Sequence, residues 1–87
     1  MSAKKSKNDF ESVDVGFVSP SYQGYFINGR EVNGGELAEV KTRIGKFIRG
    51  KIVVETEGGY LMGISIRHMV SGEESTMNII GKLVRLV

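Results

Sequence analysis

Two turn dipeptides constrain this chain more than any other feature, because each separates two runs of strand-forming residues. They are Asn28-Gly29 and Gly58-Gly59, and the flanking runs are residues 22–27 and 30–32 for the first and 51–56 and 60–70 for the second. Both central residues of a type I′ turn need a positive φ, which asparagine and glycine tolerate. The sequence therefore predicts two antiparallel β-hairpins.

Two further strands are predicted outside these hairpins. Residues 12–18 alternate apolar with small or polar side chains, which is the period of a half-buried strand, and Pro20 ends the run. After a polar loop over residues 71–75, residues 76–87 read as a last strand in which Gly81 forms a bulge.

Residues 36–49 change to a helical period. Five apolar residues in this segment fall on one helical face about 100° wide: Leu37, Val40, Ile44, Phe47 and Ile48. Asn33 stands three residues before Glu36, as in a capping box, and Gly50 follows the last turn, where a left-handed cap residue belongs. We therefore expect one amphipathic helix.

The resulting order is β-β-β-α-β-β-β, which predicts an α+β domain with one helix on an antiparallel sheet of about five to six strands. Residues 1–9 are expected to form a flexible basic tail, because MSAKKSKN has no side chain able to anchor it in a core, and residues 10–87 a single domain. The 87-residue chain has no cysteine, so packing alone must hold it together. We expect a cytoplasmic protein without a signal peptide or membrane segment.

The residues for catalysis are missing. His68 is the only histidine, and no nucleophile, base and orienting group can be assembled around it. The carboxylate pairs Glu55/Glu57 and Glu73/Glu74 fall short of a closed oxygen shell for a metal, and no glycine-rich phosphate loop is present. We therefore predict a protein that is not an enzyme and that binds no metal or cofactor.

Charge is strongly segregated along the chain. Residues 40–54 carry a charge of +5 with no acidic residue, whereas residues 9–39 sum to −5 and the whole chain to only +2. A field arranged in this way attracts an anion to one patch of a weakly basic molecule. We therefore predict a nucleic-acid-binding protein that contacts phosphates with little base discrimination.

The predicted nucleic-acid contacts fall into three sets. On the expected helix and the strand after it, the basic stripe comprises Arg43, Lys46, Arg49 and Lys51; the tail adds Lys4, Lys5 and Lys7; and Tyr22 and Tyr25 are placed to stack on bases if their rings face outward. A solvated helix face that only promotes solubility is the other interpretation of the same stripe.

The segment from the expected helix to the C-terminus resembles, in outline, an Sm-type RNA-binding fold. Glu57-Gly58 and Gly63 fall near the positions of that family's first motif, and residues 79–84 have the outline of its second, Ile-Arg-Gly-x-x-Val. Ile80 replaces the arginine, however, and seventeen residues between Gly63 and Gly81 are too few for the family's intervening strands. We therefore assign no family from these motifs.

A protein-interaction module is the alternative function, as a regulator, inhibitor or structural subunit. Residues 76–87 carry apolar side chains on both faces of the expected strand, and a sheet this small leaves edges exposed. Pairing of this strand with its copy would cover both features, so a homodimer is favoured over a monomer.

Overall fold

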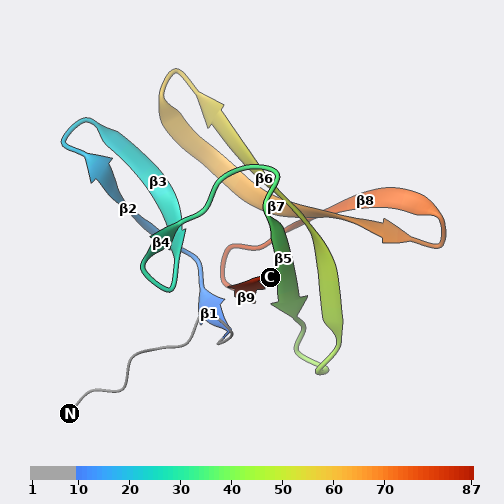
Figure 1. The fold of residues 1–87 in the computed structure, drawn as a ribbon. Helices are drawn as coiled ribbons and strands as arrows, with labels where there is room; N and C mark the ends of the chain where they lie inside the picture. The colour runs from blue at the N-terminus through green and yellow to red at the C-terminus, as the bar shows by residue number, and fades with distance from the viewer. Residues whose placement is uncertain (1–9) are drawn as a thin grey trace, which may run out of the picture.

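Residues 10–87, which are those that the structure describes, form an all-β domain in the computed structural model (Figure 1). The expected tail and its three lysines lie outside these residues. The strands are β1 (Glu11–Ser12), β2 (Asp14–Ser19), β3 (Tyr22–Ile27), β4 (Arg30–Glu31), β5 (Leu37–Lys41), β6 (Phe47–Glu57), β7 (Tyr60–Val70), β8 (Glu73–Asn78) and β9 (Leu83–Leu86). They make a six-stranded sheet in the order β1-β9-β5-β6-β7-β8 and a three-stranded sheet in the order β2-β3-β4.

The prediction of an α+β fold was wrong, because residues 36–49 form a β-hairpin in place of a helix. β5 pairs with β6 in antiparallel register, and a five-residue turn from Thr42 to Lys46 joins them. The Thr42 amide donates to the Lys46 carbonyl at 2.8 Å, and the Thr42 hydroxyl accepts from the Lys46 amide at 3.0 Å. Gly45 has a φ of 82°, which a residue inside a helix does not adopt.

The helical period led to a wrong prediction because a strand buries every second side chain, and these are not the side chains that the helix would have buried. Ala38 and Val40 of β5 are fully buried, but Leu37, Ile44 and Phe47 are exposed. The expected contact from the Asn33 amide to the Glu36 carboxylate does form, at 2.7 Å, yet a strand follows it. A local cap therefore did not decide the conformation of the segment after it.

Both predicted turn dipeptides are confirmed. Asn28 and Gly29 have φ values of 54° and 76°, and Gly58 and Gly59 have φ values of 58° and 85°. The second turn closes the ribbon formed by β6 and β7, which are eleven residues each. This β6–β7 ribbon, which contains a register shift between Glu55 and Thr56, positions the charged side chains considered below.

The C-terminal segment is two strands, so the single strand expected over residues 76–87 was wrong. Gly81, with a φ of 80°, lies in the turn between β8 and β9. β9 pairs with β1 on one side and with β5 on the other, so within the described residues it is an interior strand. We based the homodimer on a strand over residues 76–87. Its part in β9 is now occupied on both sides, whereas residues 76–78 belong to β8, which lies at an edge of the large sheet, so the dimer stays a prediction.

One core joins the two sheets. β3 of the small sheet lies against β7 and β9 of the large one, and the two are held by a shared set of buried side chains. The buried set comprises Tyr25, Ile27, Val32, Ala38, Val40, Ile52, Ile64, Ile66, Ile79 and Val84. Burial of apolar surface at about 25 cal/mol per Å² makes this cluster the main source of stability.

Gly50 lets two strands approach closely at the bend of the large sheet. A Cβ atom at this position would lie 2.2 Å from the Arg67 carbonyl oxygen and 2.9 Å from Cγ1 of Ile66. The Arg67 carbonyl of β7 therefore occupies the space that a side chain at position 50 would need. Gly50, predicted to cap a helix, is required instead for this close approach.

Candidate functional site

The side chains of β6 divide into an inner and an outer set. Even-numbered residues such as Ile48 and Ile52 face the core, whereas Phe47, Arg49 and Lys51 face outward and are exposed. Residues two apart on a strand are separated by about 6.6 Å along its axis. An aromatic ring and two cations therefore follow one another in a straight row.

A third cation joins this row from the neighbouring strand. Arg67 of β7 lies directly opposite Lys51 of β6 in the ladder. Like charges in this position destabilise a sheet. We refer to the outward side chains of Arg49, Lys51 and Arg67 as the cationic face.

Carboxylates neutralise this positive charge only in part, because Glu39 pairs with Arg49 and Glu74 with Arg67, while Lys51 is left over. Glu74 lies 3.6 Å from Arg67, but both side chains are more than half exposed, so their ion pair is weak. Lys51 has no ion pair with any residue in 10–87. The three cations line a surface hollow of about 430 Å³ together with His68, Met69 and Glu74. A hollow of this kind offers an anion several positive charges at once.

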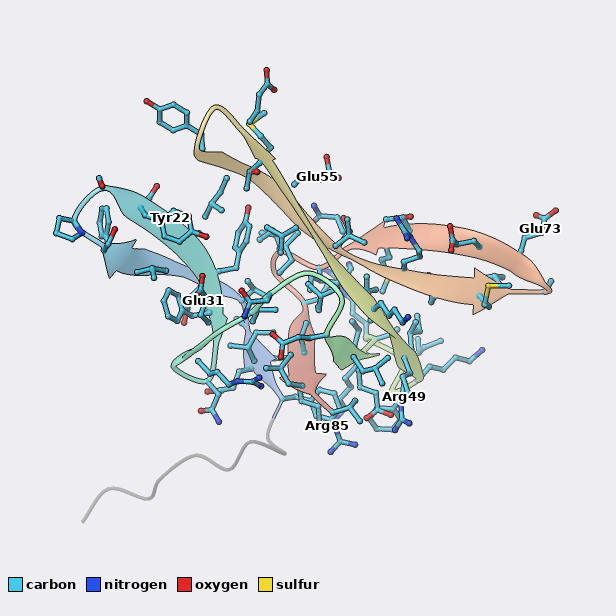
Figure 2. The ribbon with its side chains drawn as sticks, turned by 45° about the horizontal axis from the view of Figure 1, so that its top comes forward. Tyr22, Glu31, Arg49, Glu55, Glu73 and Arg85 are labelled. Carbon is cyan, nitrogen blue, oxygen red and sulfur yellow. The ribbon has the colours of Figure 1, made fainter. Side chains whose placement is uncertain are left out.

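Glu39 on β5 holds Arg49, which lies at one end of the cationic face. Its carboxylate accepts from Arg85 at 2.6 and 2.9 Å and from Arg49 at 3.3 Å. The hydrogen bonds from Arg85, aided by the positive charges of both arginines, lower the pKa of Glu39 although burial opposes them. Glu39 therefore stays ionised and fixes the position of Arg49. Figure 2 shows Arg49 and Arg85 close together at this end of the molecule.

Aromatic side chains adjoin the same end. The rings of Phe10 and Phe47 lie 5.5 Å apart between centroids, and the guanidinium of Arg85 stands 4.7 Å above the Phe10 ring. Phe47 remains 56% exposed despite these contacts. It therefore presents a flat apolar surface next to Arg49.

A second group of cations lies at the β5–β6 turn. Lys41, Arg43 and Lys82 line a hollow of about 330 Å³ together with Thr42, Met77, Gly81 and Leu83, and no carboxylate contributes to its wall. We refer to this site as the basic hollow. It is formed where the β5–β6 turn meets the turn between β8 and β9.

The structure separates the residues that the sequence placed in one stripe. Arg49 and Lys51 lie on the cationic face, Arg43 lines the basic hollow, and Lys46 closes the turn between them. No helix aligns them, so the predicted spacing of a helical face was wrong.

The two predicted tyrosines do not join this site. Stacking by Tyr25 required an outward ring, but Tyr25 is only 5% exposed and belongs to the core. Tyr22 is 48% exposed, at the start of β3. Figure 2 shows Tyr22 on the opposite side of the molecule from Arg49. The three tail lysines lie outside the described residues, so their role stays a prediction.

Sequence reasoning missed Arg67, Phe47, Lys41 and Lys82. A signal for Arg67 was present, since Tyr60, Met62, Ile64 and Ile66 were already placed on one face of a strand, which leaves Arg67 on the other. Phe47 and Lys41 depended on the hairpin that was interpreted as a helix, and Lys82 on the β8–β9 turn that was interpreted as part of one strand.

In the part of the chain that the structure describes, we find no cluster of side chains suited to catalysis or to metal binding. His68 is half-buried at the rim of the cationic face, and residues 10–87 contain no group of three or more histidine, aspartate or glutamate side chains arranged for a metal ion. The prediction that the protein is not an enzyme stays untested. Over the same residues, no helix has the length and apolarity needed to cross a membrane.

Comparisons of the chain with known protein families, with curated proteins and with solved structures found no match. The Sm-type motifs therefore assign no family. The segment that would precede the strands of such a fold as a helix is also not helical here, since residues 37–57 form β5 and β6.

Proposed function

We propose that the protein is a non-enzymatic, cytoplasmic binder of single-stranded nucleic acid, and that it uses the cationic face to contact phosphates. The observation that carries this proposal is the direct cross-strand pairing of Lys51 with Arg67, two like charges that share one exposed carboxylate, Glu74, at 3.6 Å from Arg67. A phosphate between them would relieve their repulsion and release condensed counterions.

The row on β6 supports a single strand as the ligand. Phe47, Arg49 and Lys51 alternate outward along the strand, with the aromatic ring at one end and cations continuing toward Arg67. Proteins that hold single strands combine a positively charged track for the backbone with exposed rings on which bases stack. Stacking on Phe47 replaces the role first predicted for the tyrosines.

Fluorescence anisotropy with labelled 12-nucleotide oligonucleotides tests the proposal, using single-stranded DNA, single-stranded RNA and duplex DNA at 50 to 300 mM salt. Three phosphate contacts predict a slope of about −2 in a plot of log K against log salt for single strands. Lys51→Glu/Arg67→Glu should abolish binding at 50 mM salt. The two single-stranded probes distinguish DNA from RNA preference.

Arg43→Glu/Lys82→Glu is the matched control, because it changes the net charge by the same amount at the basic hollow. We expect it to reduce affinity far less than the change at the cationic face. Absence of binding at 50 mM salt, or equal losses in the two double variants, would contradict the proposal, since equal losses would mean that only net charge matters.

A protein-interaction module remains the second candidate, favoured now by a different surface. β2 is an edge strand of the small sheet, and Val15, Phe17 and Val18 on it are 54%, 68% and 44% exposed. Unprotected apolar edges are templates for pairing with another strand. Phe17→Lys tests this candidate, because it should abolish any protein contact made through β2 and leave oligonucleotide binding unchanged.

A further inference from the structure

The β6–β7 ribbon is electrically polar along its length. Arg49 and Lys51 occupy the first half of the outer face of β6, and Glu55 and Glu57 occupy its far end. Figure 2 shows Glu55 closer to the β6–β7 turn than Arg49. At about 3.3 Å per residue, Lys51 and Glu55 are about 13 Å apart along the strand, and Arg49 and Glu57 about 26 Å.

The far end of the ribbon is a narrow projection with both acidic and apolar character. The Gly58-Gly59 turn connects Glu55 and Glu57 to Tyr60 and Met62, whose side chains are 73% and 59% exposed. We refer to Glu55, Glu57, Tyr60 and Met62 as the acidic tip. In Figure 1 the β6–β7 turn extends away from β9 and the rest of the large sheet.

The basic hollow has the complementary composition. Three cations and no carboxylate line it, and Met77 and Leu83 supply apolar surface. Leu83 is 44% exposed, and it stands directly opposite Lys41 in the β5–β9 ladder. The hollow therefore places positive charge next to apolar surface, as the tip places negative charge next to apolar surface.

Neither group has an ion-pair partner among the residues that the structure describes. Across residues 10–87, the acidic Glu55 and Glu57 make no ion pair, and neither do Lys41, Arg43 and Lys82. The tip comprises the end of β6 and the start of β7, whereas the hollow adjoins the turn before β6, so β6 separates the two groups. A contact between a tip and a hollow therefore joins two molecules.

We propose that the acidic tip of one copy of this chain occupies the basic hollow of the next. The contact uses two different surfaces, so it is heterologous, and repetition gives a ring where the rotation closes or an open chain where it does not. Complementary charges set the orientation, while Tyr60 and Met62 bury apolar surface against Leu83 and Met77. This association is separate from the cationic face and does not depend on the proposed nucleic-acid binding.

Sedimentation velocity on nuclease-treated full-length protein tests the proposal, at 10 to 500 μM in 50 and 500 mM salt. The mass of the wild-type protein should rise with concentration from the monomer value of 9.6 kDa at low salt, and less at high salt. Glu55→Lys/Glu57→Lys, which reverses the tip, and Arg43→Glu/Lys82→Glu, which reverses the hollow, should each weaken association about tenfold or more. Circular dichroism verifies that these exposed substitutions leave the fold intact.

Mixing the two reversed variants gives the sharper result. Each variant alone carries like charges on its tip and its hollow, but the positive tip of one matches the negative hollow of the other. The same holds for the negative tip and the positive hollow, so the mixture should associate as the wild-type protein does. A chain with all four substitutions should also recover association.

Asp14→Lys/Glu73→Lys is the matched control for the tip, since it replaces two exposed carboxylates elsewhere with lysine. It should associate as the wild-type protein does. A wild-type protein that stays monomeric at 500 μM in low salt would overturn the proposal. So would equal association by all variants, a mixture that does not recover, or association lost only in Phe17→Lys, which would place the interface on β2.

Discussion

The inner face of β6 is tightly packed, whereas the outer face carries charged side chains that are only partly paired. On the inner face Gly50 has no space for even one added carbon. Ile52, which lies opposite Ile66 in the ladder, is only 1% exposed. On the outer face Lys51 stands opposite Arg67, and two exposed carboxylates follow farther along the strand. One strand thus supplies stability on one side and unsatisfied charge on the other, and substitutions on the two sides should affect different properties.

The largest effect is expected at Gly50. Gly50→Ala would place a carbon 2.2 Å from the Arg67 carbonyl oxygen, which requires the two strands to separate. We expect a loss of about 3 kcal/mol or more in the free energy of unfolding, measured by urea denaturation. Gly45→Ala, in the exposed β5–β6 turn with nothing within 4 Å of the added carbon, separates this clash from the strain of an unfavourable φ. A Gly50→Ala protein as stable as the wild type would mean that the Arg67 carbonyl does not lie this close to position 50.

A large but smaller effect is expected at Ile52. Ile52→Ala leaves a cavity in the core and should cost about 3 kcal/mol in the free energy of unfolding. The cationic face lies on the other side of the sheet, so oligonucleotide affinity per folded molecule should not change. Anisotropy below the unfolding transition checks this, and a tenfold loss of affinity would show that the two faces are coupled.

Glu39 connects stability with charge, and its effect should depend on pH. Its pKa is lowered in the fold, so its ionised form stabilises the protein above its ordinary value of 4.5, and this contribution is lost as the pH falls through the lowered value. Glu39→Gln should therefore reduce stability at pH 7 and have less effect at pH 3. Because the substitution also releases Arg49, affinity for oligonucleotides should rise. Glu55→Gln, which has no ion pair within residues 10–87, is the control.

The smallest effect has the opposite sign on stability. Lys51→Thr removes one of two facing cations, so it should stabilise the protein by about 0.5 kcal/mol while weakening oligonucleotide binding. Thermal unfolding and anisotropy on the same sample measure both. A Lys51→Thr protein that is less stable than the wild type would mean that Lys51 contributes to the fold and not only to the charge of the face.

The sequence predicted the hairpins where the backbone conformation is restricted locally. Asn28-Gly29 and Gly58-Gly59 adopt positive φ values, and between two runs of strand-forming residues such a dipeptide fits few structures other than a tight hairpin turn. The conformation of the segment around Ile44 could not be predicted in this way, because the spacing of Leu37, Val40 and Phe47 fits one face of a helix. In the structure Leu37 and Phe47 lie on the outside of a sheet. Gly45 and the Thr42 hydroxyl, which close the β5–β6 turn, were the local signals for a hairpin.

From the sequence we could predict that the site is positively charged, but not which side chains lie next to one another on its surface. Arg49 and Lys51 are two residues apart, so either a strand or a helix with its following strand accommodates them. Their neighbour Arg67 depends on the register of β6 against β7, which is fixed by contacts such as Ile52 with Ile66. Long-range pairing of this kind is not readable from local patterns.

The register shift between Glu55 and Thr56 has a consequence for the geometry of any assembly. A bulge in a two-stranded ribbon increases its local right-handed twist, so it rotates the acidic tip about the ribbon axis relative to the basic hollow. In a head-to-tail chain that rotation is repeated at every subunit. The residue that this shift leaves unpaired is Met62, so one residue of the acidic tip sets the pitch of a head-to-tail helix or its closure into a ring.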